Sequence, residues 1–187
     1  MRLSEFTVRL LILDKEDKVD KVLVTNRSGS NHFDRSAVDL INNDNHDKLV
    51  LSCTECVLYN KATVDTMVLY GSLDSKATIN GDDVTVNTIH IEPLASVYIK
   101  AWHPHIHAIH IQSRGCLHVT PEFLRHTNNI VLNFEDEAVL YVDDKRYEYR
   151  GYKDPHEFVD NIMYPKLRVI KDSVIKIFQS KEKEDEN

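Results

Sequence analysis

Long hydrophobic runs are missing from this sequence. The longest lies within VRLLILD, residues 8–14, and is far too short to cross a bilayer. The first residues, MRLSE, are charged and polar where a secretory signal peptide would begin its apolar segment. We therefore expect a cytoplasmic protein that does not associate with membranes.

Cysteine is also scarce. The chain of 187 residues contains three cysteines, an odd number that fits no disulfide framework and indicates a reducing compartment. Cys53 and Cys56 have the CxxC spacing of a zinc knuckle or a redox site, but no second CxxC follows them. A thioredoxin-like site would also need a βαβ setting, which the pattern does not indicate. We interpret the cysteines as buried structural residues.

Common catalytic and nucleotide-binding motifs are absent as well. The chain has no GxGxxG, GxxxxGKS/T, GxSxG or HExxH. The acidic pairs Asp82–Asp83 and Asp143–Asp144 lie in polar segments, where aspartate is typical of turns. With 23 Lys and Arg against 30 Asp and Glu, the net charge is −7. This charge disfavours direct binding to nucleic acid and is compatible with a basic partner protein.

What the sequence does contain is the composition of one soluble globular domain, with 42% hydrophobic and 28% charged residues. Residues 1–47 predict a hairpin and a short helix packed on the core. The alternation of residues 6–13 predicts one strand, and KVLVT, residues 21–25, predicts its partner. The short helix is predicted from Asp34 by the apolar positions Ala37, Val38, Leu40 and Ile41.

A repeat occupies residues 48–150, where short β-rich runs alternate with polar turns. NTIHIEPLASVYIK, residues 87–100, aligns without a gap on HAIHIQSRGCLHVT, residues 107–120, at a shift of 20 residues. Weaker repeats precede and follow this pair. The expected strand centres form two series, Val50, Val68, His90, His110 and Val131, and Leu58, Thr78, Tyr98, His118 and Leu140.

Such intervals are typical of a β-solenoid, in which each coil covers the apolar face of its neighbour. The predicted fold class is therefore mainly β, a solenoid-like stack with coils of about 20 residues. The alternative is a β-sandwich or a cupin-like barrel with evenly spaced strands. In the solenoid, three coils or roughly 14 Å separate Cys56 from Cys116, so the thiols share no site. The inward residues of the aligned pair are Ile89, Ile91, Val97, Ile99, Ile109, Ile111, Leu117 and Val119.

The C-terminal residues predict a helix. Asp154 and Pro155 match an N-cap followed by proline at the first helical position, and Pro165 interrupts the pattern. We interpret residues 151–180 as a helical cap over the end of the solenoid, with a dimer contact as the alternative. KEKEDEN, residues 181–187, is expected to be a disordered acidic tail. The apolar face of the helix comprises Leu167, Ile170, Val174, Ile175 and Phe178.

Five of the ten histidines lie in residues 90–110. In the repeat register, His90 and His110 occupy the same column on adjacent coils, about 4.8 Å apart. The flanking isoleucines point to the opposite face. We interpret the two histidines as a stacked structural pair on a solvated face, with partner binding as the functional alternative.

A second histidine group suggests a metal site. His103, His105 and His107 alternate along an extended segment, which places them on one face, one coil from Asp83. Imidazole and carboxylate are ligands of zinc, iron and nickel, and His110 is a further candidate. Against this reading, the proline within the segment indicates a bend and not a rigid ligand platform.

Two functions follow from these patterns. The leading interpretation is a non-catalytic protein-binding or assembly module without a cofactor, such as a viral or phage accessory protein that acts on a partner protein or self-associates. The alternative is a metal-dependent enzyme of the small-barrel class that uses the cluster His103–His110 to hold one transition metal ion. It is similar to a cupin only in the clustered histidines, since the expected glycines and the glutamate after the HxH pair are missing.

For the leading interpretation, Trp102 either anchors a partner or covers the core. The candidate contacts are His90, His110, Trp102, Leu167, Ile170, Val174 and Phe178.

Overall fold

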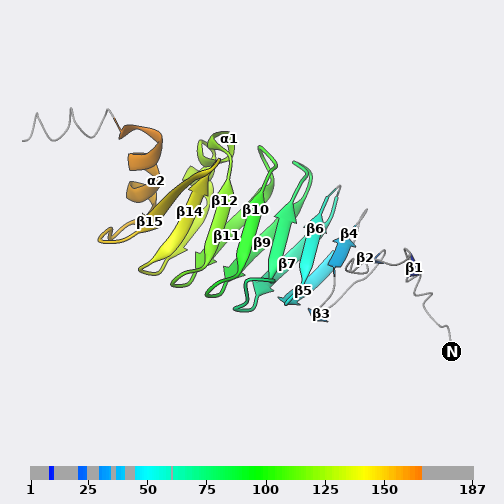
Figure 1. The fold of residues 1–187 in the computed structure, drawn as a ribbon. Coiled ribbons are helices and arrows are strands. Elements are labelled where there is room, and N and C mark those ends of the chain that lie inside the picture. The colour runs from blue at the N-terminus through cyan, green and yellow to red at the C-terminus, as the bar shows by residue number, and fades with distance from the viewer. Residues whose placement is uncertain are drawn as a thin grey trace, which may run out of the picture. The chain divides into compact units, whose positions relative to one another are not determined.

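The computed structural model describes residues 9–10, 21–24, 30–34, 37–40, 45–59 and 61–165. The chain divides into two compact units after Gly151. The first unit is a β-solenoid of about five turns, as the repeat predicts. Figure 1 shows its strands stacked in two facing sheets.

The coils contribute strands alternately to the two sheets, and from β5 to β12 the strands of the second sheet are the longer ones. The first sheet comprises, in spatial order, β1 (Arg9–Leu10), β2 (Lys21–Val24), β4 (Ala37–Leu40), β6 (Glu55–Leu58), β8 (Lys76–Ile79), β10 (Ser96–Ile99), β12 (Cys116–Val119), β14 (Ala138–Val142) and β15 (Lys145–Tyr149). The second comprises β3 (Ser30–Asp34), β5 (Asn45–Ser52), β7 (Thr63–Leu69), β9 (Thr85–Ile91), β11 (His105–Ile111) and β13 (Val131–Phe134).

The strands of successive coils pair in parallel, and the register of the aligned repeat is confirmed. His90 pairs with His110, and Tyr98 pairs with His118. Three of the predicted strand centres are shifted. Leu58 pairs with Ile79, Leu140 with Leu117, and Val131 with Ala108, and none of these three lies in the column predicted for it.

The core consists of apolar columns that run from coil to coil between the sheets. In one column, Leu49, Met67, Ile89 and Ile109 pair in succession and are all fully buried. Burial of such side chains is the main stabilising contribution of a solenoid, because each coil packs only on its neighbours. All eight residues predicted to point inward are at most 4% exposed.

Gly115 lies where the turn before β12 passes close to the preceding coil. A Cβ atom at this position would lie 2.9 Å from the carbonyl oxygen of Ile91 and 3.0 Å from that of Gln112. Both are backbone atoms that accept hydrogen bonds, Ile91 from the N–H of Gln112 and Gln112 from that of Gly115, so a shift of either would disturb these bonds. Glycine is therefore required here by the close approach of two backbones.

The helix predicted from Asp34 is wrong, because residues 30–34 and 37–40 are strands β3 and β4. β4 pairs in parallel with β2 and β6. A short apolar run fits either structure, and strand pairing with two neighbours decides between them. The predicted N-terminal hairpin is confirmed where it is described, since β1 pairs antiparallel with β2.

A short helical segment interrupts the β region between β12 and β13. Helix α1 (Pro121–Leu124) begins at Thr120, whose hydroxyl accepts the backbone N–H of Phe123 at 3.2 Å. A 3₁₀ turn at Thr127–Asn129 follows. This insertion lengthens the coil, so that His110 pairs with Asn133, and it displaces Val131 from its predicted column.

The second unit begins at Tyr152 and contains helix α2 (Pro155–Met163). The predicted N-cap is confirmed, because the Asp154 carboxylate accepts the backbone N–H of His156 at 2.9 Å. Within the described residues, no helix has the length and apolar character needed to cross a membrane. The predicted apolar face and acidic tail, residues 167–187, lie outside the described residues.

Candidate functional site

The outer face of the first sheet carries a column of stacked rings near its C-terminal end. Tyr98, His118 and Tyr141 lie on β10, β12 and β14 and pair in register. Their ring centroids are 4.1 Å and 4.3 Å apart, with interplanar angles of 17° and 1°. Parallel pairing places equivalent side chains about 4.8 Å apart, which is the spacing that flat rings need to stack. We call these three residues the aromatic ladder.

His118 lies between the two tyrosines and is half-buried. Burial lowers its pKa below the usual value of 6.5, because the charged imidazolium loses hydration. The neutral form is therefore favoured at neutral pH. Because the His118 ring is stacked on both faces, the ladder presents ring edges outward.

A second outward column lies beside the ladder and is formed by Ser96, Cys116 and Val139. The Cys116 thiol donates to the carbonyl oxygen of Arg114 at 3.7 Å. Burial raises the pKa of this thiol above its usual value. Val139 is only 5% exposed although it faces outward, because longer side chains from the neighbouring column and from β15 surround it.

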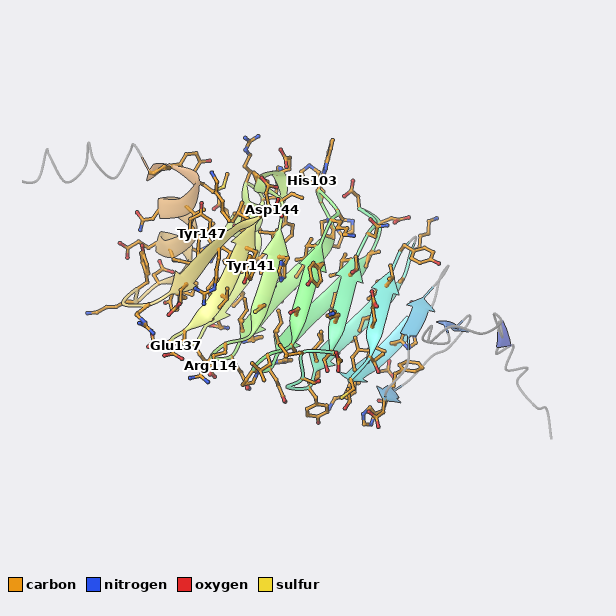
Figure 2. The ribbon with its side chains drawn as sticks, in the orientation of Figure 1. His103, Arg114, Glu137, Tyr141, Asp144 and Tyr147 are labelled. Carbon is orange, nitrogen blue, oxygen red and sulfur yellow. The ribbon has the colours of Figure 1, made fainter. Side chains whose placement is uncertain are left out.

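A third column lies in the turns that precede the short strands. Leu94, Arg114 and Glu137 have positive φ angles of 72°, 63° and 67°. The N–H of Leu94 donates to the carbonyl of Arg114, and the N–H of Arg114 donates to that of Glu137, both at 3.1 Å. The repeated turn conformation thus holds the Arg114 and Glu137 side chains next to each other. Figure 2 shows both at the same end of the strands.

Strand β15 closes the sheet and adds one charged side chain to each column. Arg146 pairs with Tyr141, and Glu148 pairs with Val139. Arg150 follows the strand and reaches Glu137 at 3.1 Å. The antiparallel return of the chain therefore places an arginine or a glutamate at the end of each of the three columns.

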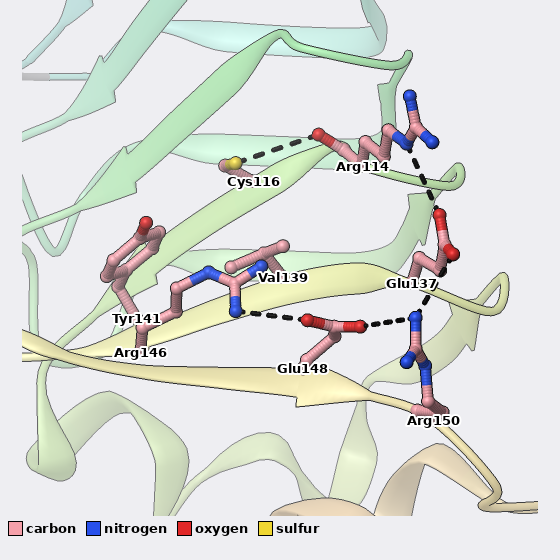
Figure 3. Close-up of a pocket in the computed structure, with 8 residues that line it drawn as sticks. All are labelled: Arg114, Cys116, Glu137, Val139, Tyr141, Arg146, Glu148 and Arg150. Carbon is pink, nitrogen blue, oxygen red and sulfur yellow. Dashed lines mark hydrogen bonds and ion pairs between the residues drawn. The ribbon is translucent and has the colours of Figure 1, made fainter.

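These side chains form a continuous charged chain, which we define as Arg114–Glu137–Arg150–Glu148–Arg146. The four ion pairs measure 3.2, 3.1, 3.0 and 3.0 Å along this order. Figure 3 shows the charged chain curving around Val139 and Cys116, with Tyr141 beside Arg146. Together these eight residues line an open pocket of about 410 Å³.

The charged chain shifts the ionisation of its members. Hydrogen bonding to Arg114 is the main cause that lowers the pKa of the Glu137 carboxyl, and Arg150 contributes further. Hydrogen bonding to Glu148 raises the pKa of Arg146. The pocket therefore combines three arginines with two glutamates, a formal excess of one positive charge, in a protein whose net charge is −7.

The predicted histidine stack is confirmed as a structure. The rings of His90 and His110 lie 4.7 Å apart at 11°, and His110 Nδ1 lies 3.0 Å from the amide nitrogen of Asn133. Burial, followed by the charges of His110 and Lys48, lowers the pKa of His90. The stack lies on the second sheet, away from the pocket.

The other predicted site residues are not brought together. His105 and His107 are exposed on β11. The ring centroids of His103 and His126 lie 3.8 Å apart. Asp83 is exposed in a turn. Among the residues that the structure describes, no three His, Cys, Asp or Glu side chains lie close enough to hold a metal ion.

Asp82 and Trp102 lie in the turns that precede β9 and β11, in successive coils. The Asp82 carboxylate accepts the N–H groups of Trp102 and His103 at 2.7 and 2.8 Å, which ties two successive coils together. These two hydrogen bonds lower the pKa of the Asp82 carboxyl, and the bond from His103 is the larger cause. The Trp102 side chain is 59% exposed, so it does not cover the core.

None of the three cysteines forms a disulfide, and Cys56 and Cys116 share no site. Cys56 is fully buried on β6, and Cys116 is half-buried on β12, with β8 and β10 between those strands. Cys53 faces Ser72, with Sγ to Oγ at 3.5 Å. The inference that Cys56 and Cys116 lie three coils apart is confirmed.

Sequence reasoning missed both the aromatic ladder and the charged chain. The alignment placed Tyr98 over His118 and so contained one part of the ladder. The signal for the rest is RYEYR, residues 146–150, in which charged and aromatic residues alternate directly after the last repeat. Comparison with protein-family models, curated proteins and solved structures found no match to this chain.

Proposed function

We propose that the protein is a non-catalytic binding module and that a partner protein docks on the outer face of the first sheet, over the aromatic ladder and the charged chain. The observation that carries the proposal is the stacked ladder of Tyr98, His118 and Tyr141, which ends at Arg146. Tyrosine and arginine are among the residues enriched at the energetic centres of protein interfaces.

Rigidity supports this role. The three rings are held by strand pairing on both sides and by each other, so little side-chain entropy remains to be lost when a partner covers them. An aromatic strip bordered by charged groups also has the usual arrangement of an interface, with aromatic residues at the centre and a polar rim. A partner placed over the ladder would therefore meet both parts at once.

The chemistry of the pocket favours binding over catalysis. The raised pKa of Cys116 keeps it a thiol at neutral pH, and the thiol is a poor nucleophile compared with the thiolate. The His118 ring is stacked on both faces. The glutamates of the pocket hold arginines through both carboxylate oxygens, so they are poorly placed to act as bases.

The test uses proteins captured from cell extract on the immobilised full chain, followed by calorimetry with each purified partner. We expect Tyr141→Ala to weaken binding at least ten-fold, since truncating a central interface residue costs about 2 kcal/mol or more. Thr88→Ala on the second sheet is the matched control, because the next coil already carries Ala108 at this position. It should bind as the wild type does.

Two results would contradict the proposal. One is a partner that binds Tyr141→Ala and wild type equally; the other is the failure to recover any partner with measurable affinity. Sedimentation of the wild type alone identifies self-association. If Tyr141→Ala dissociates an oligomer, the partner is a second copy of the chain.

A further inference from the structure

Building on the proposed function, we infer that the pocket receives a carboxylate from the docked partner and that the partner segment is an acidic peptide. The carboxylate would lie over Val139 and Cys116, inside the curve of the charged chain and beside Tyr141 (Figure 3). The hydrogen-bonding groups of the pocket that are not yet engaged determine which ligand it can hold.

Both glutamates are engaged through both carboxylate oxygens. Glu137 contacts Arg114 through Oε2 and Arg150 through Oε1. Glu148 contacts Arg146 through Oε2 and Arg150 through Oε1. Every carboxylate oxygen in the charged chain therefore already accepts from an arginine.

The arginines are engaged only in part. The ion pairs use one nitrogen of each guanidinium, namely Nε of Arg114, Nη1 of Arg146 and Nη2 of Arg150. A guanidinium carries five N–H donors and accepts no hydrogen bond. Each carboxylate oxygen keeps one further acceptor site, but the N–H donors that the three guanidinium groups have left outnumber these sites. The surplus capacity of the charged chain is thus for donation, which matches a ligand that brings acceptor oxygens. A carboxylate is the smallest such group that arginine can hold with two parallel hydrogen bonds.

Exposure makes these donors available. The side chains of Arg114, Arg146 and Arg150 are 71%, 51% and 65% exposed. The two ends of the charged chain, Arg114 and Arg146, each contact a single glutamate. A carboxylate from the partner, placed near these ends, would extend the alternation of charges. The pocket would then hold three arginines and three carboxylates in place of three arginines and two carboxylates.

The charge of the surroundings favours a short acidic peptide over nucleic acid. A phosphate backbone brings a continuous row of negative charges, which would meet Glu137, Glu148 and a chain of net charge −7. One or two acidic side chains avoid that repulsion. The adjacent ladder offers ring edges to the face of an aromatic side chain of the same peptide, which is a favourable edge-to-face arrangement.

The experiment measures fluorescence anisotropy with the full-length protein. The probe is a labelled peptide of alternating glutamate and tyrosine, and the control peptide has glutamine in place of glutamate. We expect the glutamate peptide to bind wild type at least ten-fold more tightly than the glutamine peptide. Arg114→Gln and Arg146→Gln should each reduce that preference at least five-fold.

Two further variants separate the pocket from overall charge and from misfolding. Arg125→Gln removes the same charge from α1, at the opposite end of the strands from Arg114, and should leave the preference unchanged. Glu137→Gln removes an internal acceptor and a negative charge, so it should strengthen binding of the glutamate peptide at least two-fold. Loss of folding cannot produce that gain.

Each outcome bears on the inference. Equal binding of both peptides, or an equal effect of Arg125→Gln and Arg146→Gln, would overturn it. The inference would also be overturned if neither peptide bound the wild type. The same holds if a single-stranded oligonucleotide bound the wild type more tightly than the glutamate peptide does and Arg146→Gln abolished that binding. If both peptides bind equally and Tyr141→Ala abolishes both, the acidic preference is wrong while the proposed docking face stands.

Discussion

Replacing Ile109 with alanine tests the inward column of the solenoid. Ile109 is fully buried and pairs with Ile89 on one side and Leu132 on the other. The substitution deletes three carbon atoms, which at about 0.8 kcal/mol each amounts to about 2.4 kcal/mol of transfer free energy. Strand pairing holds the neighbouring coils in place, so a cavity adds to this cost. We expect a total loss of about 2 to 5 kcal/mol.

The assay is equilibrium urea denaturation followed by far-ultraviolet circular dichroism. If the unfolding free energy falls with urea concentration at an unchanged slope while the midpoint is lower, the substitution has changed stability. The matched control is His105→Ala, on the exposed end of the same strand, which should change the unfolding free energy by less than about 0.5 kcal/mol. If Ile109→Ala also lost less than about 0.5 kcal/mol of unfolding free energy, the assignment of Ile109 to the inward face would be refuted.

A double substitution tests whether the columns couple adjacent coils. Ile89 and Ile109 are neighbours, so truncating both produces one merged cavity in place of two separate ones. We expect the double variant to deviate from the sum of the single losses by about 0.5 kcal/mol or more. Additive losses would show that the two coils pack independently.

Two more predictions concern the histidine stack and the turn before β12. The pKa of His90 is lowered, so as pH falls through about 6.5 the unfolded chain takes up a proton that the folded protein does not, and stability decreases. His90→Thr should flatten this dependence in urea melts between about pH 7.5 and 5, and an unchanged slope would contradict it. Gly115→Ala should lower stability by about 1 to 3 kcal/mol in the same assay, because its Cβ would meet the Ile91 carbonyl at 2.9 Å. No loss would show that this turn can shift.

The repeat was predictable because the same pattern recurs with little change over two coils. Ile-His-Ile occurs twice at a shift of 20 residues, and one alignment fixes the register of all positions that lie between. Each strand must bury one face, so a shift by one residue would expose isoleucine and bury histidine. This constraint made the inward set and the His90–His110 stack readable from the sequence.

The errors occurred where the repeat is irregular. Ala37, Val38 and Leu40 form a run too short to carry a period, and only pairing with β2 and β6 makes them a strand. Helix α1 adds residues between β12 and β13, and an insertion of unknown length shifts every later column. Its signal was Thr-Pro-Glu at residues 120–122, where threonine caps a helix and proline occupies the first turn.

The candidate site was not predictable because its members are far apart in sequence. Arg114 and Glu137 become neighbours only through the stacking of two turns with positive φ. Arg146 and Glu148 reach the same pocket through an antiparallel strand that has no counterpart in the repeat. No spacing rule connects these positions, since the length of the α1 insertion sets the distance along the chain.

The end of a solenoid is where distinct chemistry can arise on a regular surface. Along the coils, the parallel strands repeat the same backbone arrangement, and only some outward columns, such as the aromatic ladder, repeat similar side chains. Strand β15 breaks this regularity by running antiparallel and placing Arg146, Glu148 and the following Arg150 against three columns. Charged side chains on the last described strand of the sheet also oppose the addition of another strand. The same residues therefore discourage pairing at the edge and leave the face of the sheet as the surface on which a partner can dock.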